Sequence, residues 1–350
     1  MDWVRGESVG RGSFAKVNLA IPRNSSIQFS SPTAVKSSEV STSSSLKNEK
    51  RILDWIGSCP RIIRCFGDDY TFENGSDYYN LFLEYASGGS LSDQLKLHGG
   101  KFQETSVRGY ARSIIEGLMH IHENGFVHCD IKLQNILVFS GGEIKIADFG
   151  LAKKTGENEK KTGFECRGTP LFMSPESVNS GEYESPADIW AFGCAVVEMV
   201  TGKPAWNVRS DPNMFSLFVR IAVGEELPEI PEELSQEGKD FLAKCFFKDP
   251  TKRWTAEMLL KHPFLSDGTV TLECVNEKKP SPRSQFDFPD WVSSTTTSVP
   301  CTPEFGEASE WKYDSTSLSN FFSPTNRLRE IATNNGPLDW SESDGWTCVR

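Results

Sequence analysis

Three side chains that can move protons and bind charged oxygens lie close together in the segment "VHCDIKLQNILV", residues 127–138. Asp130 could accept a proton from a hydroxyl group, and Lys132 could neutralise a phosphoryl group during transfer. Asn135 could bind a metal ion through its amide oxygen. His128 is more typical of a packed, hydrogen-bonded histidine than of a base. The spacing indicates a loop that handles phosphate.

A further candidate metal ligand, Asp148, follows 18 residues after Asp130 in the triplet "DFG". Its carboxylate is a hard ligand suited to Mg²⁺. The apolar runs at 136–138 and 144–147 predict a strand pair that separates the two carboxylates. A DFG triplet alone is often only a turn, but at this distance from Asp130 it indicates a shared site.

The segment "VGRGSFAKV", residues 9–17, is a glycine-rich turn between two strand-like runs. Gly10 and Gly12 would let the backbone approach phosphate groups without a Cβ in the way. Ala15 replaces a third glycine. Because a strand follows the turn, it differs from a Rossmann fingerprint, where a helix follows. Alone, the pattern favours nothing more than a tight hairpin.

Two charged residues follow the glycine turn. Lys36 ends the strand-like run "TAVK", and Glu49 lies on a helix predicted over 46–56. Each would ordinarily be a solvated surface charge. Together with the glycine turn they form a pair that could orient the phosphates of a nucleotide.

In this order, with "GTPLFMSPE" at 168–176, the motifs resemble the eukaryotic protein-kinase domain over residues 3–265. The resemblance implies an α+β bilobal protein-kinase fold, with a small β-rich lobe over about 3–84 and a larger helical lobe over about 90–265. It also implies an enzyme that uses ATP and Mg²⁺.

The resemblance implies roles residue by residue. Asp130 would be the catalytic base, assisted by Lys132 and Asn135, and Asn135 and Asp148 would bind the metal. Leu83 would be the gatekeeper residue of the nucleotide site. The residues implied to bind the nucleotide are Val9, Gly10, Gly12, Ser13, Ala15, Val17, Lys36, Glu49, Glu84 and Ala86.

Two structural contacts are also implied by the resemblance. Glu176 would pair with Arg253 beneath the platform that receives the protein substrate. Asp188 in "ADIWAFG" would brace the backbone of the catalytic loop. Thr169 in "GTP" would belong to the substrate platform.

Lys132 resembles the serine/threonine class, and "GTPLFMSPE" agrees. The non-arginine "HCDIK" and the "HPF" after "RWTAEMLL" resemble plant MEKK-like MAP kinase kinase kinases, whose substrates are MAP kinase kinases in stress or hormone signalling. Two alternatives stay open. One is a pseudokinase scaffold, and the other is a serine/threonine kinase outside the MAP kinase cascade.

Cys129 stands where many kinases have an arginine that binds a phosphorylated residue of the activation segment. A cysteine cannot make that charge-assisted, bidentate bond. Because the catalytic set is otherwise intact, we predict a working enzyme whose activation segment (148–176) is held by its own packing or by a partner. Activity should depend little on phosphate at Thr155 or Thr162.

The elements that must position these residues are read from apolar periodicity. Strands are predicted over 3–36, with the glycine turn between them, and a strand pair over 61–72 and 78–86. "IWAFGCAVV", at 189–197, is too short to span a bilayer and predicts a buried core helix. Beyond 46–56, helices are predicted over 91–97, 104–124, 185–201, 214–223, 235–246 and 255–260.

The composition of the chain argues against some classes of binding partner and some locations in the cell. The net charge of −11 argues against nucleic acid, because a binder of the phosphate backbone needs a basic face. Nine scattered cysteines without a zinc-like spacing predict reduced, intracellular thiols. The N-terminal residues contain no apolar signal core. We therefore expect no membrane partner and a location in the cytoplasm, the nucleus or both.

Residues 266–350 are acidic and rich in Ser, Thr and Pro, which predicts a mostly disordered regulatory tail. "FDFP" at 286–289 resembles a docking motif for MAP kinases. Three Ser-Pro or Thr-Pro pairs could be phosphorylated by such a kinase. Alternatively, the four tail tryptophans could dock on the lobes and restrain them.

Overall fold

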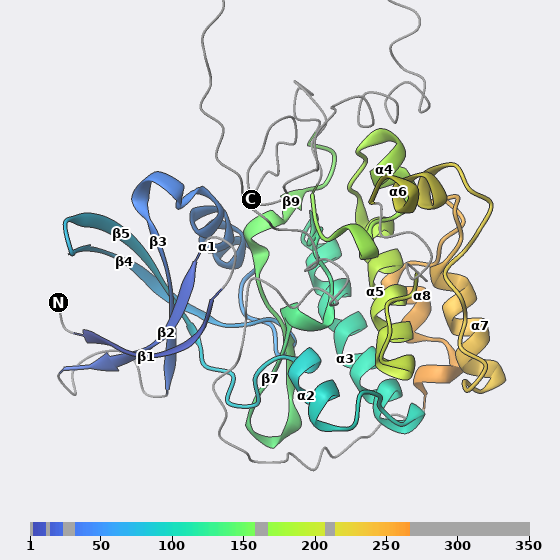
Figure 1. Ribbon diagram of the computed structural model, residues 1–350, viewed down its shortest axis with the longest axis horizontal. Coiled ribbons are helices and arrows are strands. Elements are labelled where there is room, and N and C mark those ends of the chain that lie inside the picture. The colour runs from blue at the N-terminus through green and yellow to red at the C-terminus, as the bar shows by residue number, and fades with distance from the viewer. Residues whose placement is uncertain (1–2, 12–14, 24–31, 158–166, 207–213, 267–350) are drawn as a thin grey trace, which may run out of the picture.

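The computed structural model describes residues 3–11, 15–23, 32–157, 167–206 and 214–266. In these residues the chain forms a small β-rich lobe and a larger helical lobe, joined by a short connector after Glu84 (Figure 1). The predicted bilobal fold is confirmed. The acidic tail, Gly12, Ser13 and Thr162 lie outside the described residues.

The small lobe is built on one antiparallel sheet of five strands in the order β1-β2-β3-β5-β4. On β1, Trp3 donates through Nε1 to Asp69 on β4 at 3.0 Å, and Arg5 pairs with Glu73 at 2.8 Å. Because β1 and β4 are the two edges of the sheet, these contacts show that the sheet curls until its edges meet. The strands are β1 (Trp3–Arg11), β2 (Lys16–Pro22), β3 (Thr33–Glu39), β4 (Cys65–Glu73) and β5 (Ser76–Glu84).

Strand β3 and helix α1 (Ser44–Ile56) position the charged pair of this lobe. Residues 33–38 are all buried, so Lys36 begins inside the lobe and not at a solvated strand end. Glu49 is fully buried on the same face of α1 as its apolar residues. Because a buried charge without a partner is costly, each needs the other. The apolar residues of that face are Leu46, Ile52, Leu53 and Ile56.

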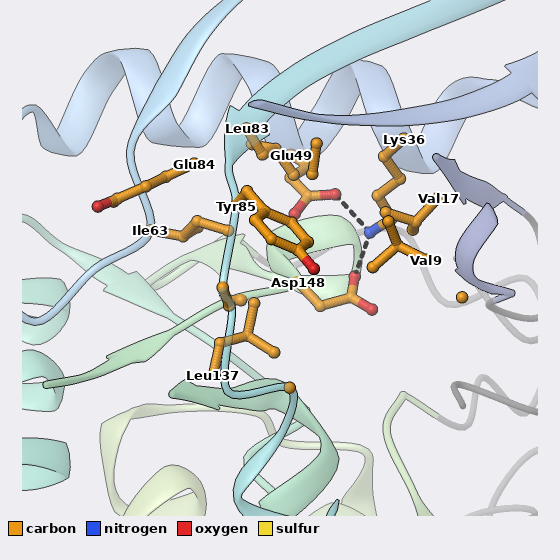
Figure 2. Close-up of a pocket in the computed structure, with 15 residues that line it drawn as sticks. Val9, Val17, Lys36, Glu49, Ile63, Leu83, Glu84, Tyr85, Leu137 and Asp148 are labelled. Atoms are coloured by element: carbon orange, nitrogen blue, oxygen red, sulfur yellow. Dashed lines mark hydrogen bonds and ion pairs between the residues drawn. The ribbon is translucent and has the colours of Figure 1, made fainter. Parts of the chain in front are cut away.

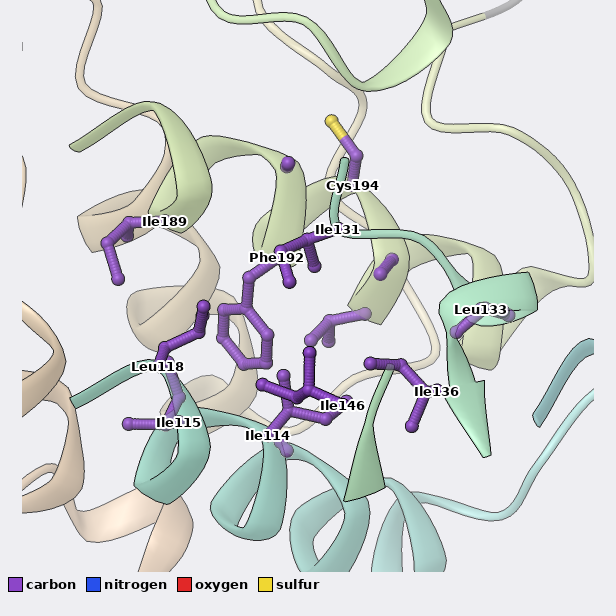
Figure 3. Close-up of a cluster of buried hydrophobic side chains, with 14 of the residues drawn as sticks. Ile114, Ile115, Leu118, Ile131, Leu133, Ile136, Ile146, Ile189, Phe192 and Cys194 are labelled. Atoms are coloured by element: carbon purple, nitrogen blue, oxygen red, sulfur yellow. The ribbon is translucent and has the colours of Figure 1, made fainter. Parts of the chain in front are cut away.

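Helix α5 (Ser185–Thr201) runs through the centre of the large lobe (Figure 1). Its residues 187–197 are all buried, which confirms the core helix predicted from "IWAFGCAVV". Figure 3 shows Phe192 of α5 packed toward Leu118 of helix α3 (Glu104–Glu123). No helix of the described part is long and apolar enough to cross a membrane.

The helix predicted over 46–56 begins two residues earlier, at Ser44, and the remaining predicted helices are confirmed within one residue at each end. One helix, α4, was missed. Helix α4 is only six residues long, and it starts at Pro175 with Ser174 as its N-cap. The helices are α2 (Leu91–Leu97), α3 (Glu104–Glu123), α4 (Pro175–Ser180), α6 (Met214–Ala222), α7 (Gln236–Cys245) and α8 (Ala256–Leu260).

The segment that carries Asp130 is anchored by its apolar neighbours. Ile131 and Leu133 have no exposed area and point into the core of the large lobe (Figure 3). Asp130 and Lys132 alternate with them and meet outside the core. Short strand pairs frame the segment: β6 (Phe126–Val127) with β9 (Lys153–Lys154), and β7 (Ile136–Val138) with β8 (Ile144–Ile146).

Glu198 is the second acidic residue of helix α5, after Asp188, and one of its carboxylate oxygens, Oε2, is buried without a hydrogen-bond partner among the described residues. Burial raises the pKa of Glu198 to about 7 from its ordinary 4.5, although Lys96 and Lys132 oppose the rise. Between these two pH values the folded chain keeps a proton that the unfolded chain releases. Stability therefore falls as the pH rises through this window.

We predict that Glu198→Gln, which mimics the protonated form, stabilises the protein at pH 8 by about 2 kcal/mol and has little effect at pH 5. Urea unfolding at both pH values measures this difference. The control is Glu233→Gln, at an exposed glutamate outside the helices, and it should change neither value. An equal gain from Glu198→Gln at both pH values would contradict the explanation by burial of a charge.

Candidate active site

A cleft between the two lobes gathers residues from the glycine turn, β3, the connector and the large lobe (Figure 2). It holds about 540 Å³ of space, part of which is open to solvent. The lining residues are Val9, Gly10, Val17, Ala34, Lys36, Glu49, Ile63, Leu83, Glu84, Tyr85, Ala86, Gly89, Leu137, Ala147 and Asp148.

Lys36 joins two carboxylates at the back of this cleft. Its Nζ lies 2.7 Å from Glu49 Oε2 and 2.9 Å from Asp148 Oδ1 (Figure 2). The predicted pair of Lys36 and Glu49 is confirmed. The Lys36 and Glu49 side chains are 7% and 0% exposed, whereas Asp148 is 34% exposed and reaches the open part of the cleft. The ammonium group is thus fixed at the place where negative phosphate oxygens would need a cation.

Helix α1 also contacts the backbone around the DFG triplet. Glu49 Oε1 accepts from the Phe149 amide at 3.3 Å, and Asn48 Nδ2 donates to the carbonyls of Gly150 and Ala152 at 3.2 and 2.9 Å. A Cβ on Gly150 would lie only 2.2 Å from Ser45 Oγ, so a larger residue there would require the Ser45 side chain to move. These contacts keep Asp148 and Glu49 within reach of Lys36.

Asp130 is the centre of a second group of contacts. Its Oδ2 lies 2.9 Å from Lys132 Nζ and accepts from Asn135 Nδ2 at 2.9 Å, and its Oδ1 accepts from Thr169 Oγ1 at 2.7 Å. Lys132 also donates to Thr169 at 2.7 Å. The residues predicted to be catalytic are therefore together, and Thr169 of the predicted substrate platform is with them.

This group determines the protonation state of Asp130. Burial alone would raise the pKa of Asp130, but the charge and hydrogen bond of Lys132 and the hydrogen bond of Thr169 outweigh it and lower the pKa. At neutral pH the side chain is therefore a carboxylate. Such a group can accept a hydrogen bond, and then a proton, from a hydroxyl group placed beside it.

Asp188 on α5 fixes the backbone next to Asp130 by hydrogen bonds. The Asp188 carboxylate accepts from the amides of His128 and Cys129 at 2.8 and 2.9 Å, and from His122 Nε2 at 2.9 Å. This confirms the predicted brace. Cys129 has a φ of 67° and Asp148 a φ of 66°, conformations that are uncommon outside glycine. The surrounding bonds hold this strain at the site.

The predicted pair of Glu176 and Arg253 is confirmed. The guanidinium binds both carboxylate oxygens, with Nη1 and Nη2 at 2.6 and 3.0 Å. Arg253 also donates to the carbonyls of Pro186 and Phe247 and lies over the Trp190 ring at 5.1 Å. It thereby joins the end of the activation segment to helix α5 and to the chain before α8.

The remaining predicted nucleotide residues differ in their placement. Val9, Gly10, Val17 and Ala86 line the cleft. Glu84 also lines it, but its side chain turns away (Figure 2) and binds Lys145 at 2.7 Å, so only its backbone faces a ligand.

Ala15 is buried in a cluster with Leu46 and Tyr79 and is not among the residues that line the cleft. Several lining residues were not predicted, because the sequence does not show which side of a short apolar strand faces the ligand. These are Ala34, Ile63, Tyr85, Gly89, Leu137 and Ala147.

Comparison with known proteins gives the family. The family model described as the protein kinase domain matches residues 3–265. The chain belongs to the protein kinase family. It is 47% identical over its full length to the full length of mitogen-activated protein kinase kinase kinase 20 of Arabidopsis thaliana. Kinases 17 and 18 of the same series from that plant are 43% and 42% identical over 76% of this chain, which corresponds to 70% and 78% of their own lengths.

Within the kinase domain, contacts with Gly125 and Glu184 fix the start of the activation segment. Both the amide and the hydroxyl group of Thr155 donate to the Gly125 carbonyl, at 2.9 and 3.0 Å. Lys153 and the Gly156 amide bind Glu184 Oε1 at 3.5 and 3.1 Å. A phosphate on Thr155 would have to break its hydroxyl contact.

We predict that replacing Thr155 and Thr162 with Ala leaves at least about half of the kinase activity, because a cysteine at position 129 offers a phosphate no cation. Initial rates of the purified double variant, with its melting temperature as the control for folding, measure this. A loss of more than about tenfold in folded protein would show that phosphate on this segment is needed.

Proposed function

We propose that this chain is a serine/threonine kinase that transfers the γ-phosphate of ATP to MAP kinase kinases. The observation that carries the proposal is the complete set of contacts around the cleft. Lys36 is paired with Glu49 and Asp148, and an ionised Asp130 lies beside Lys132. A pseudokinase need not keep any of these contacts.

The donor set suits Mg²⁺. Asn135 donates through Nδ2 to Asp130, so its oxygen is the atom turned to a metal, and the partly exposed Asp148 supplies a carboxylate. Mg²⁺ typically takes one or two protein ligands and completes its shell with phosphates and water. When bound, it would neutralise charge on the phosphates.

Residues of the chain itself would bind the nucleotide and accept the proton of the substrate hydroxyl group. The apolar walls of the cleft would hold the adenine, with backbone groups of Glu84 and Ala86 at the connector. Lys36 would bind phosphate oxygens. Asp130 would accept the proton of the attacking serine or threonine hydroxyl group, and Lys132 would neutralise charge on the phosphoryl group that moves.

The substrate class rests on the names of the relatives, which are MAP kinase kinase kinases over most or all of the chain. The test uses catalytically inactive MAP kinase kinases as acceptors, with labelled ATP. The matched control is the same acceptor with its activation-segment serines and threonines replaced by alanine. Labelling of the first acceptor and not of the control supports the proposal. Labelling of both equally, or of neither while another protein is labelled, would assign the kinase to a different cascade.

The proposed tail docking of a downstream MAP kinase involves Phe286 and Phe288, which lie outside the described residues. If it is correct, replacing both with alanine lowers phosphorylation of the tail by a MAP kinase. Unchanged phosphorylation would remove this part of the proposal. A location in the cytoplasm or the nucleus is proposed with it.

A further inference from the structure

Arg167, at the far end of the activation segment, is a buried cation that the predicted catalytic mechanism does not use. It is 5% exposed. Its Nη1 donates to the carbonyl of Leu151, next to the DFG triplet, at 3.3 Å, and its amide donates to Tyr183 Oη at 2.8 Å. The contacts with Leu151 and Tyr183 connect the end of the activation segment to its beginning and to the chain before α5.

Arg167 lies beside Cys129. The two residues line the same small pocket next to Asp130. The following residue, Gly168, has a φ of 100°, and a Cβ there would lie 2.4 Å from the Cys129 carbonyl oxygen. The chain at 167–168 is therefore packed directly on the catalytic loop. The Cys129 backbone is itself fixed by Asp188, so this contact has a rigid base.

The Cys129 thiol adds no charge to this pocket. Burial and the neighbouring Asp188 raise its pKa well above the usual value, and Arg167 and Lys153 only partly oppose this. The thiol is therefore neutral at physiological pH. The cations of the pocket come from the activation segment and not from the catalytic loop.

We propose that Arg167 is a positioning residue that holds the activation segment in its active place, in the space that a small residue at 129 leaves. Arg167, which belongs to the activation segment, supplies the positive charge that an arginine at position 129 supplies in many kinases. The segment therefore needs no phosphate to be held in place. An arginine at 129 would bring a second buried guanidinium into this pocket, with overpacking and repulsion between like charges.

Arg167 is connected to Asp130 through the next two residues of the chain, Gly168 and Thr169. Thr169 follows Gly168 and donates to Asp130 at 2.7 Å, and it accepts from Lys132 at the same distance. Loss of the Arg167 contacts would release Thr169 from Asp130. We therefore expect a fall in kcat, whereas the ATP-binding residues of the cleft, and with them the KM for ATP, stay as they are.

The test rests on the proposed kinase activity and uses the full chain after phosphatase treatment, with ATP, Mg²⁺ and myelin basic protein as acceptor. Arg167→Ala should lower kcat at least about tenfold and change the KM for ATP less than about threefold. Arg167→Lys, which keeps the cation, should recover part of the loss. The control is Arg220→Ala, which removes a half-exposed arginine that pairs with Glu226 and lies over the Trp206 ring. A wild-type kcat in Arg167→Ala would overturn the proposal.

A second test places an arginine at position 129 and removes the one at position 167, so it does not depend on Arg167→Ala alone. Cys129→Arg should be nearly inactive, and Cys129→Arg/Arg167→Ala should be several-fold more active than Cys129→Arg, because the crowding is relieved. A double variant no more active than Cys129→Arg would contradict the shared pocket.

Hydrogen exchange separates this proposal from the proposed function. Amides of residues 167–176 should exchange faster in Arg167→Ala than in the wild type, whether or not the protein transfers phosphate. Faster exchange together with an inactive wild type would reject the proposed function and keep Arg167 as the anchor. Unchanged exchange would reject the anchor.

Discussion

An Asp130→Asn variant is expected to transfer phosphate roughly 10³-fold more slowly than the wild type, while its affinity for ATP stays within about threefold. The amide has the same shape as the carboxylate but cannot accept the proton of a substrate hydroxyl group. It also removes the negative charge that pairs with Lys132 at 2.9 Å. The cleft residues that we propose to hold ATP are on other elements, and the substitution should leave them unchanged.

Initial rates with labelled ATP and fluorescence titration with a nucleotide analogue measure the two effects. Asp249→Asn is the matched control, because Asp249 is an aspartate at the surface that accepts only from Thr251 and pairs loosely with Lys252. It should keep the full rate. A residual rate of Asp130→Asn above about one tenth of the wild type would mean that another group accepts the proton.

The second large effect is on stability. Arg253→Ala should destabilise the kinase domain by about 3–5 kcal/mol, because it leaves the Glu176 carboxylate buried without its partner. The Arg253 side chain is 0% exposed and makes two bonds to that carboxylate. At this chain size the loss corresponds to a fall in melting temperature of roughly 6–20 °C.

Two variants make this prediction specific. Arg253→Lys should recover little, since an ammonium cannot reproduce the planar fork that binds both oxygens. Lys252→Ala, at the neighbouring position, removes a side chain that is 70% exposed and should change the melting temperature by about a degree or less. Equal effects of Arg253→Ala and Lys252→Ala would show that the buried pair contributes no more than a surface charge.

The sequence alone predicted those site residues that lie on a regular helix or strand, because their spacing follows the period of that element. Apolar periodicity placed Glu49 on a helix, and the strand "TAVK" placed Lys36 before it, and the two side chains do meet. The same holds for the core helix α5, which the apolar run at 189–197 predicted, whereas the role of Asp188 on it came only from the resemblance to kinases.

Other parts of the site depend on approaches between distant segments that no local pattern encodes. Arg167 reads as a charge in a loop, yet it is buried because residues 167–168 pack on Cys129. Asn48 reads as a surface residue of a helix, yet it binds two carbonyls beyond the DFG triplet. Ala15 reads as part of a phosphate loop, yet it packs with Leu46.

Cys129 is thus best understood together with what surrounds it. The contacts of Asp130, Lys132 and Lys36 are complete without an arginine at this position. In its described residues, the activation segment is held at Leu151 by Arg167, at Thr155 by the Gly125 carbonyl and at Lys153 by Glu184. We infer an enzyme that is assembled as it folds and is regulated through other parts of the chain or through partners.

The most direct test of this account is the turnover rate of the purified full chain whose activation segment has been dephosphorylated, verified by mass spectrometry. Labelled ATP with Mg²⁺ and an inactive MAP kinase kinase serve as substrates, and Asp130→Asn is the blank. We expect a rate within about threefold of the untreated kinase and no signal from the blank. ATP binding without any transfer would contradict it and would mark Cys129 as a sign of lost catalysis.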